Sequence, residues 1–254
     1  MSARALLGDG DVQITLLSST ASLWTFAVPE DGGFVPPDQA TAKCEDGVTK
    51  TLTKLLRCAL RCRARAATAA LGGAPFDEAA CESGNPATSC RAKYDRATAT
   101  LVAAGNCPPC LDASALAGPL ASSFDALKGA LYCAGTTPFG GESAGFVPPD
   151  AATARCEAGI GTGVAKLLVC VGKCHIRRAD LGVAGLPFDD DACERTDARK
   201  SCRAKYDKVS GALLAAGACP ACLDSSTLAG LADQTEGLLD RANGQVYCAS
   251  TTPF

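Results

Sequence analysis

Residues Cys156 to Cys174 read CEAGIGTGVAKLLVCVGKC, and residues Cys44 to Cys62 read CEDGVTKTLTKLLRCALRC. In both stretches the second and third cysteines follow the first by 14 and 18 residues. On an α-helix, 14 residues fall about 40° short of whole turns and 18 residues make about five whole turns, so the three sulfurs share one face. Apolar side chains lie on the same face: Val48, Leu52, Leu55 and Ala59, and Ile160, Val164, Leu167 and Leu168. Each stretch therefore predicts one long helix whose thiol-bearing face points toward a core.

The two stretches belong to a longer repeat. Seven of the eight cysteines in the first copy recur at a constant offset of 112 residues, and the last, Cys133, recurs three residues later than that, as Cys248. The repeat predicts two tandem units, over residues 33–139 and 145–254, joined by a flexible polar linker over residues 140–144. Because each unit is long enough to bury a core of its own, we expect the two to fold as independent beads.

Within each unit the order of sequence signals predicts three to four helices. GFVPPD, at residues 33–38 and 145–150, opens a unit with two prolines that favour an extended chain and an Asp that can cap a helix. The long helix that follows is expected to end near Ala70 or Ala179. A PFD turn, a second helix carrying CRAKYD and a third helix come next, and the unit closes on YCA-x-TTPF. We therefore predict an all-α fold of two disulfide-rich helical repeats.

Residues 1–32 belong to neither repeat. Residues 12–17 and 23–28 are rich in β-branched and aromatic side chains and read as two short strands. An isolated hairpin is marginal in water, so this β-like N-terminal arm should pack on a repeat or on another chain. The alternative is that it is the tail of an upstream domain. Strand edges and extended TTPF tails suit strand addition, which predicts self-association or a cell-surface partner.

The sixteen cysteines indicate where the protein works. An even number of cysteines in a chain with few aromatic residues favours disulfides, which supplement a thin core. Disulfides in turn predict an extracellular or cell-surface location, the alternative being a reduced cytosolic protein with thiol-bound metal. A signal peptide is not visible, because residues 8–11 interrupt the apolar region that should follow Arg4, and we suppose that Met1 is not the native start. No run of 18 apolar residues exists, so no transmembrane segment is expected.

Helix geometry narrows the pairing of the cysteines. If the first two helices of a unit form an antiparallel hairpin, Cys58 and Cys62 lie beside Cys90 and Cys81, and Cys44 lies about 20 Å lower. The predicted disulfides are Cys58–Cys90, Cys62–Cys81, Cys170–Cys202 and Cys174–Cys193. The other cysteines are expected to pair within their own repeat, in an order that the sequence leaves open: Cys44, Cys107, Cys110 and Cys133, and Cys156, Cys219, Cys222 and Cys248.

Two cysteine patterns could carry chemistry. Cys107-Pro-Pro-Cys110 and its counterpart have the spacing of thiol–disulfide oxidoreductases, but no strands of a thioredoxin-like fold flank them. Thiols on a helix could also hold Cu(I) or zinc, although a thiol store would need cysteines on several helices facing one lumen. We interpret both patterns as structural disulfides, and keep a thiol-based metal carrier and a redox protein as alternatives.

Neither the one histidine nor the acidic runs indicate a group of catalytic residues. His175 follows Cys174 as in a stretched haem c attachment sequence, but Arg63 stands at its place in the first repeat, and a cationic helix end explains it without haem. The run Asp189 to Asp191 lacks the alternating oxygens of a calcium loop and is typical of a first helical turn. We therefore predict no catalytic residue, no bound metal and no cofactor.

Charge excludes some partners. The chain has 24 basic and 27 acidic residues and a net charge of −3, which favours neither nucleic acid nor an anionic membrane. Four arginines gather near the end of the first long helix: Arg57, Arg61, Arg63 and Arg65. They would suit an anionic ligand, but we interpret them as a solvated helix end.

The motifs together resemble a known group. GFVPPD, PFD, CRAKYD, C-P-x-C-L-D and YCA-x-TTPF are similar to cysteine-rich repeats found in predicted secreted proteins of myxobacteria and related bacteria. The resemblance covers residues 33–254 and implies a bacterial exported protein with tandem copies, but no mechanism. With no catalytic set, we expect a non-enzymatic extracellular structural, adhesive or binding protein.

Overall fold

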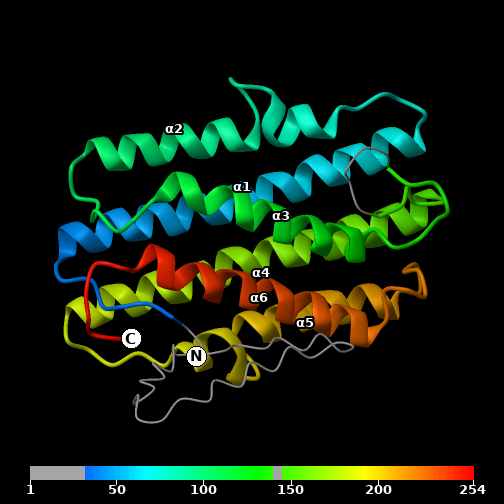
Figure 1. The fold of residues 1–254 in the computed structure, drawn as a ribbon. Coiled ribbons are helices and arrows are strands. Elements are labelled where there is room, and N and C mark those ends of the chain that lie inside the picture. The colour runs from blue at the N-terminus through cyan, green and yellow to red at the C-terminus, as the bar shows by residue number, and fades with distance from the viewer. Residues whose placement is uncertain (1–31, 140–144) are drawn as a thin grey trace, which may run out of the picture.

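The computed structural model describes residues 32–139 and 145–254, and these two ranges are all-α (Figure 1). The first half holds α1 (Gln39–Leu71), the short π-helix η1 (Ala80–Gly84), α2 (Cys90–Ala103) and α3 (Ala113–Leu131). The second half holds α4 (Ala151–Val183), η2 (Ala192–Thr196), α5 (Cys202–Ala215) and α6 (Ser225–Val246) in the same order. The predicted β-like arm lies outside the described residues, apart from Gly32.

The long helices begin and end at local signals. The carboxylate of Asp38 accepts a hydrogen bond from a backbone N–H at 2.8 Å at the start of α1, and Asp150 does the same at 2.7 Å at the start of α4. Such a cap stabilises a helix by about 1 kcal/mol. Each helix ends two residues before a left-handed glycine, Gly73 with φ 67° and Gly185 with φ 68°, slightly beyond the predicted ends.

The two long helices form the centre of the molecule. α1 and α4 lie lengthwise against each other and run in opposite directions, while α2 covers α1, α5 covers α4, and α3 lies against α6 (Figure 1). The central contact is so close that a Cβ atom on Gly172 would lie 2.7 Å from Cγ2 of Thr53. One continuous core holds side chains of both halves, among them Val48, Ile160 and Val164. The expectation of two independent beads is therefore wrong, because each half buries its apolar face against the other.

Six disulfides lie within a half. Two hold the upper part of each helical hairpin and join the predicted partners: Cys58–Cys90, Cys62–Cys81, Cys170–Cys202 and Cys174–Cys193. One more closes the lower end of each hairpin: Cys44–Cys107 and Cys156–Cys219. These bonds fix the register of the first two helices in each half.

The remaining two disulfides cross between the halves. Cys110 pairs with Cys248, and Cys133 pairs with Cys222. The expectation that these four cysteines pair within their own repeat is wrong. Cys110 and Cys133 flank the 19 residues of α3, a helix about 28 Å long, whereas the Cα atoms of a disulfide lie within about 7 Å. The third helix thus carries the last cysteine of one half to the other half.

The ends of the two halves are joined in the same reciprocal way. The backbone N–H of Phe146 donates to the carbonyl of Tyr132 at 2.8 Å, where the first half meets the second. The N–H of Phe34 donates to the carbonyl of Tyr247 at 2.9 Å, and that of Val35 to the carbonyl of Thr252 at 2.9 Å. The closing segment of each half therefore docks on the opening segment of the other. The TTPF tails that we expected to be open to strand addition are occupied in this way.

Among the described helices, α4 alone has a stretch both long enough and apolar enough to span a bilayer. By length and composition it could cross a membrane, with a mean hydropathy of 1.3 in its most apolar window, although the sequence led us to expect no such segment. Within that window 61% is buried inside the described body. Its apolar surface thus packs mainly against the neighbouring helices.

Candidate functional site

The cysteines, which the sequence offered as metal or redox ligands, are all bonded in pairs. All sixteen lie in the described residues, and none is a free thiol. The sulfurs of Cys58, Cys62 and Cys90 lie close together, but each belongs to a disulfide. Cys107 and Cys110 each pair with a distant cysteine instead of with each other. This arrangement leaves no thiolate for soft-metal binding and no CxxC disulfide for exchange.

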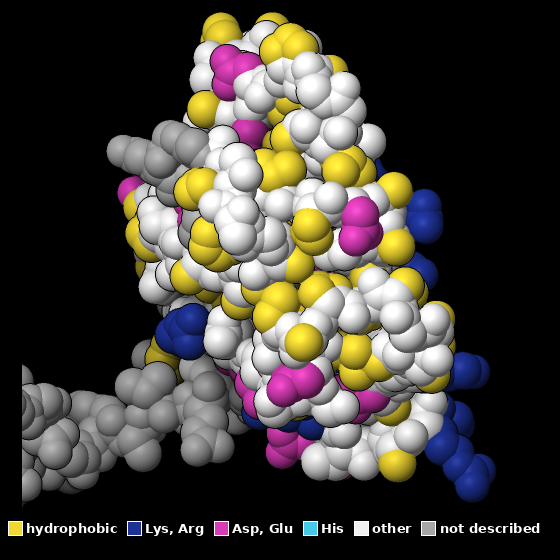
Figure 2. Space-filling view, turned by 90° about the vertical axis from the view of Figure 1, so that its right-hand side faces the viewer, with side chains coloured by type: hydrophobic (Ala, Val, Ile, Leu, Met, Phe, Trp, Pro, Cys, Tyr) yellow, Lys and Arg dark blue, Asp and Glu magenta, His cyan; other side chains and the backbone are white. Residues whose placement is uncertain are grey.

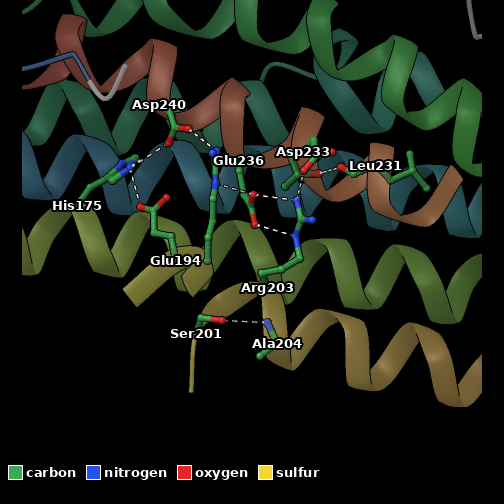
Figure 3. Close-up of polar contacts among 11 residues, drawn as sticks. His175, Glu194, Ser201, Arg203, Ala204, Leu231, Asp233, Glu236 and Asp240 are labelled. Atoms are coloured by element: carbon green, nitrogen blue, oxygen red, sulfur yellow. Dashed lines mark hydrogen bonds and ion pairs between the residues drawn. The ribbon is translucent and has the colours of Figure 1, made fainter. Parts of the chain in front are cut away.

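The sole histidine lies in a buried charge cluster. His175 projects from α4, and its side chain is 2% exposed. Its Nε2 atom lies 3.0 Å from Oε1 of Glu194 on η2 and 3.4 Å from Oδ1 of Asp240 on α6 (Figure 3). The ligand atoms of His175, Glu194 and Asp190 all lie within 4.8 Å of one another. The interpretation of His175 as part of a solvated helix end is therefore wrong.

Arginines surround this cluster and hold its acids. Arg178 contacts Oδ2 of Asp190 at 2.9 Å, and Arg195 contacts Oδ2 of Asp240 at 3.1 Å. Arg195 and Arg203 both contact Glu236, and Arg203 also contacts Asp233 (Figure 3). These contacts join α4, η2, α5 and α6 in one polar network, so the acidic run after the PFD turn does more than begin a helix.

Burial and charge together set the pKa values in the cluster. Burial alone would lower the pKa of His175, but hydrogen bonds to Asp240 and Glu194 outweigh it and raise this pKa to about 10. Burial raises the pKa of Glu194 to about 7, against the opposing effect of His175. In the absence of another cation, the imidazole therefore carries a proton at neutral pH.

The first half has a different cluster at the equivalent place. Arg63, which is fully buried, contacts Oε1 of Glu78 at 3.1 Å. The ammonium of Lys128, also buried, lies 2.5 Å from Glu82, 2.6 Å from Asp125 and 3.6 Å from Glu78. Two permanent cations thus fill the centre of this cluster. The interpretation of Arg63 as part of a solvated helix end is also wrong.

A second feature lies on the surface. Every exposed charged side chain of α1 and α4 is basic: Lys43, Lys50, Lys54, Arg57, Arg61 and Arg65 on α1, and Arg155, Lys166, Lys173 and Arg177 on α4. On each helix these residues fall within about 80° of arc, so they form a stripe. In the end-on view of Figure 2, most of the Lys and Arg side chains in sight stand out along one edge. We call the two stripes together the basic face.

The two stripes meet in the middle of the molecule. A groove of about 180 Å³ between α1 and α4 is lined by Arg57, Arg61 and Lys166. A larger concavity of about 490 Å³ beside it is lined by Arg61, Arg65 and Lys93. The net charge of −3 concealed this face, because acids of the same helices, Glu45, Asp46 and Glu157, are buried. A helical-wheel plot of each long helix would have revealed it.

Comparison with known proteins assigns neither a family nor a function to this chain. The chain matches no family model, no curated protein and no solved structure. The resemblance to exported bacterial repeat proteins therefore stays a prediction, and the function must be argued from the residues described above.

Proposed function

We propose that this is a non-enzymatic extracellular protein of the adhesive or binding kind, and that its basic face holds an acidic polysaccharide of a cell surface. The observation that carries the proposal is that all exposed charges of α1 and α4 are basic. Four of the positions recur at an offset of 112 residues: Lys43 and Arg155, Lys54 and Lys166, Arg61 and Lys173, and Arg65 and Arg177. Each half therefore contributes an equivalent stripe.

The dimensions of the basic face favour a polymer over a small anion. The stripe on α1 runs from Lys43 to Arg65, a rise of about 33 Å, and the stripe on the antiparallel α4 lies alongside it across the groove. A row of like charges on a rigid support binds a polyanion by releasing its counterions, and each charge adds to the affinity. The eight disulfides supply the rigidity and fit the oxidising conditions outside a cell.

The interior supports a role without catalysis. Among the described residues, the sole histidine lies buried between carboxylates instead of in an open cleft. The concavity of about 490 Å³ beside the groove is lined by arginine, lysine and disulfide sulfurs among other side chains, and no carboxylate lines it to serve as general acid or base. These features are typical of a binding surface.

The test is binding to alginate and heparin, compared between the natural chain and Arg57→Ala/Arg61→Ala/Lys166→Ala. Because the three side chains line one groove, their loss should weaken binding at least tenfold at about 0.1 M salt. It should also reduce the slope of log Kd against log salt concentration by about two to three. Isothermal titration calorimetry at several salt concentrations measures both quantities.

The matched control removes the same residue types elsewhere: Arg199→Ala/Lys200→Ala/Arg241→Ala. These three side chains are exposed but lie outside α1 and α4. If the control loses as much affinity as the groove variant, binding reflects total charge and the basic face is not the site. Tight binding to single-stranded DNA without binding to either polysaccharide would instead make the partner a nucleic acid.

A further inference from the structure

The buried charge clusters of the two halves can be aligned residue by residue. The hydroxyl of Tyr94 on α2 donates to the carbonyl of Ala113, and that of Tyr206 on α5 donates to the carbonyl of Leu228. Positions on α3 and α6 therefore correspond at an offset of 115 residues, because α6 has about one extra turn at its start. Positions on the long helices and the π-helices correspond at 112. The equivalent pairs are Arg63 and His175, Glu78 and Asp190, Glu82 and Glu194, Asp125 and Asp240, and Lys128 and Asn243.

The alignment shows which charges the two clusters share. Three carboxylates are present in both clusters. The two basic residues of the first cluster, Arg63 and Lys128, which we call its fixed cations, have no basic equivalent in the second. His175 stands in place of Arg63, and Asn243, which is 1% exposed, stands in place of Lys128. In the first half the Lys128 ammonium lies among the carboxylates. The second half thus keeps the three carboxylates that surround the Lys128 ammonium in the first half. At the place of that ammonium it has the neutral amide of Asn243.

The charges of the second cluster leave a place for a divalent ion. The acids are Asp190, Glu194, Asp233, Glu236 and Asp240, and the arginines are Arg178, Arg195 and Arg203. Five carboxylates against three guanidiniums leave two negative charges. These two charges are balanced either by two protons, on His175 and Glu194, or by one divalent cation.

The spacing of the ligand atoms suits a small metal ion. Zn²⁺ lies about 2.0–2.2 Å from imidazole nitrogen and carboxylate oxygen, so two ligand atoms of a tetrahedral site are about 3.3–3.6 Å apart. Nε2 of His175 lies 3.4 Å from Oδ1 of Asp240, which is within this range. It lies 3.0 Å from Oε1 of Glu194, a hydrogen-bond distance that has to lengthen by about 0.3 Å when an ion enters. Apart from these contacts, these two buried oxygens have no hydrogen-bond partner among the described residues.

We propose that His175, Glu194, Asp240 and Asp190 form a binding site for one divalent first-row transition ion, with Zn²⁺ as its best probe. Arg178 and Arg195 orient the site by holding the Oδ2 atoms of Asp190 and Asp240. Imidazole and carboxylate ligands suit Zn²⁺ and its neighbours in the first row. The ion replaces the proton of the imidazole and links α4, η2 and α6. The site is independent of the basic face.

The test uses the full chain without any added histidine, so that His175 is the sole imidazole. Titration with Zn²⁺ by calorimetry should give one ion per chain with a micromolar or lower Kd, and the NMR signals of the His175 ring should shift in step with binding. The variant His175→Arg/Asn243→Lys installs the residues that stand at the equivalent places of the first half, Arg63 and Lys128. It should bind no Zn²⁺ while keeping eight disulfides by intact mass and an unchanged circular dichroism spectrum.

The reciprocal exchange, Arg63→His/Lys128→Asn, sharpens the test. It removes both fixed cations from the first cluster and should raise the stoichiometry to two ions per chain. Absence of saturable Zn²⁺ binding by the natural chain would overturn the proposal, and so would binding that persists in His175→Arg/Asn243→Lys. Zn²⁺ binding with no change in the His175 ring signals would place the ion elsewhere and overturn it as well. A reciprocal variant that still binds one ion would overturn the inference that the absence of these two cations makes the second cluster a metal site.

Discussion

Two glutamates couple the ends of the halves to the central helices. Oε1 of Glu45 on α1 accepts a hydrogen bond from the backbone N–H of Cys248 at 3.1 Å, and Oε1 of Glu157 on α4 accepts one from that of Ala134 at 3.3 Å. Both residues are fully buried, and burial raises the pKa of each carboxyl to about 7. At neutral pH these acids therefore titrate within the folded protein.

This arrangement predicts that the protein is more stable in mild acid than at neutral pH. Because the folded pKa of Glu45 and of Glu157 lies above the ordinary 4.5, the folded state binds more protons. The associated stability is complete below about pH 4.5 and is lost as pH rises through 7, on the order of 1 kcal/mol per group. Guanidinium unfolding at pH 5 and pH 7.5 should show this difference. Glu45→Gln/Glu157→Gln should reduce this difference, leaving the share of other buried carboxyls whose pKa is also raised, such as Glu194. A natural chain equally stable at both pH values would contradict the assignment.

At the scale of an element, the ends of α3 and α6 differ in one hydroxyl contact. Tyr247 follows α6, and its hydroxyl donates to Asp46 at 2.9 Å and accepts from Thr49 at 3.3 Å. Tyr132 follows α3 in the same way, but Ala158 and Gly161 line the groove beside it, and its hydroxyl has no hydrogen-bond partner among the described residues. The two tyrosines therefore form a matched pair.

We expect Tyr247→Phe to lower the free energy of unfolding by about 1–3 kcal/mol, because it leaves the buried Asp46 without its hydroxyl partner. Tyr132→Phe removes the same atom from a place where it bonds nothing in the described residues, so its cost should stay below about 0.5 kcal/mol. Denaturant unfolding of both variants measures the difference. Equal losses would mean that the hydrogen bonds of Tyr247 contribute no net stability.

The helices themselves were largely predictable, and their buried charges were not. Cysteine spacing and the Asp38 cap are local signals, and they placed α1 and the hairpin disulfides correctly. The burial of His175 and Arg63 depends on η1, η2 and the third helices, which lie far away along the chain. The one available signal was that the two repeats differ at these positions while sharing the acids around them.

At the scale of the whole molecule, the repeat itself hid the connectivity. Because Cys133 and Cys248 occupy equivalent places, a bond from Cys110 to either satisfies the same repeat pattern. Only the length of α3, which separates Cys110 from Cys133, excludes the bond within one half. The same ambiguity applied to the TTPF tails, which dock on the opening segment of the opposite half. The pattern of a single unit therefore predicted two independently folded units. In the structure the two halves form a closed pair, in which each half supplies the disulfide partners and the end contacts of the other.

The closed pair predicts how a single unit behaves alone. A chain of residues 33–144 keeps the hairpin disulfides, but Cys110 and Cys133 lie at opposite ends of α3 and cannot meet. A second copy supplies the missing partners, since the natural halves already exchange them through Cys110–Cys248 and Cys133–Cys222. We expect a two-fold symmetric dimer with two Cys110–Cys133 bonds between the copies, which also buries the apolar face of α1 against its own copy.

Non-reducing mass spectrometry and peptide mapping of this half-chain provide the measurement. The expected species has twice the mass of one unit and falls to the single mass on reduction, while Cys110→Ser/Cys133→Ser should give a dimer without covalent links that dissociates on dilution. The full chain, mapped in parallel, should yield peptides that join Cys110 to Cys248. A folded half-chain monomer with Cys110 bonded to its own Cys133 would show that one unit can close on itself. In that case the shared core of α1 and α4 would be a docking of two complete domains, and the reciprocal disulfides would not be a condition of folding.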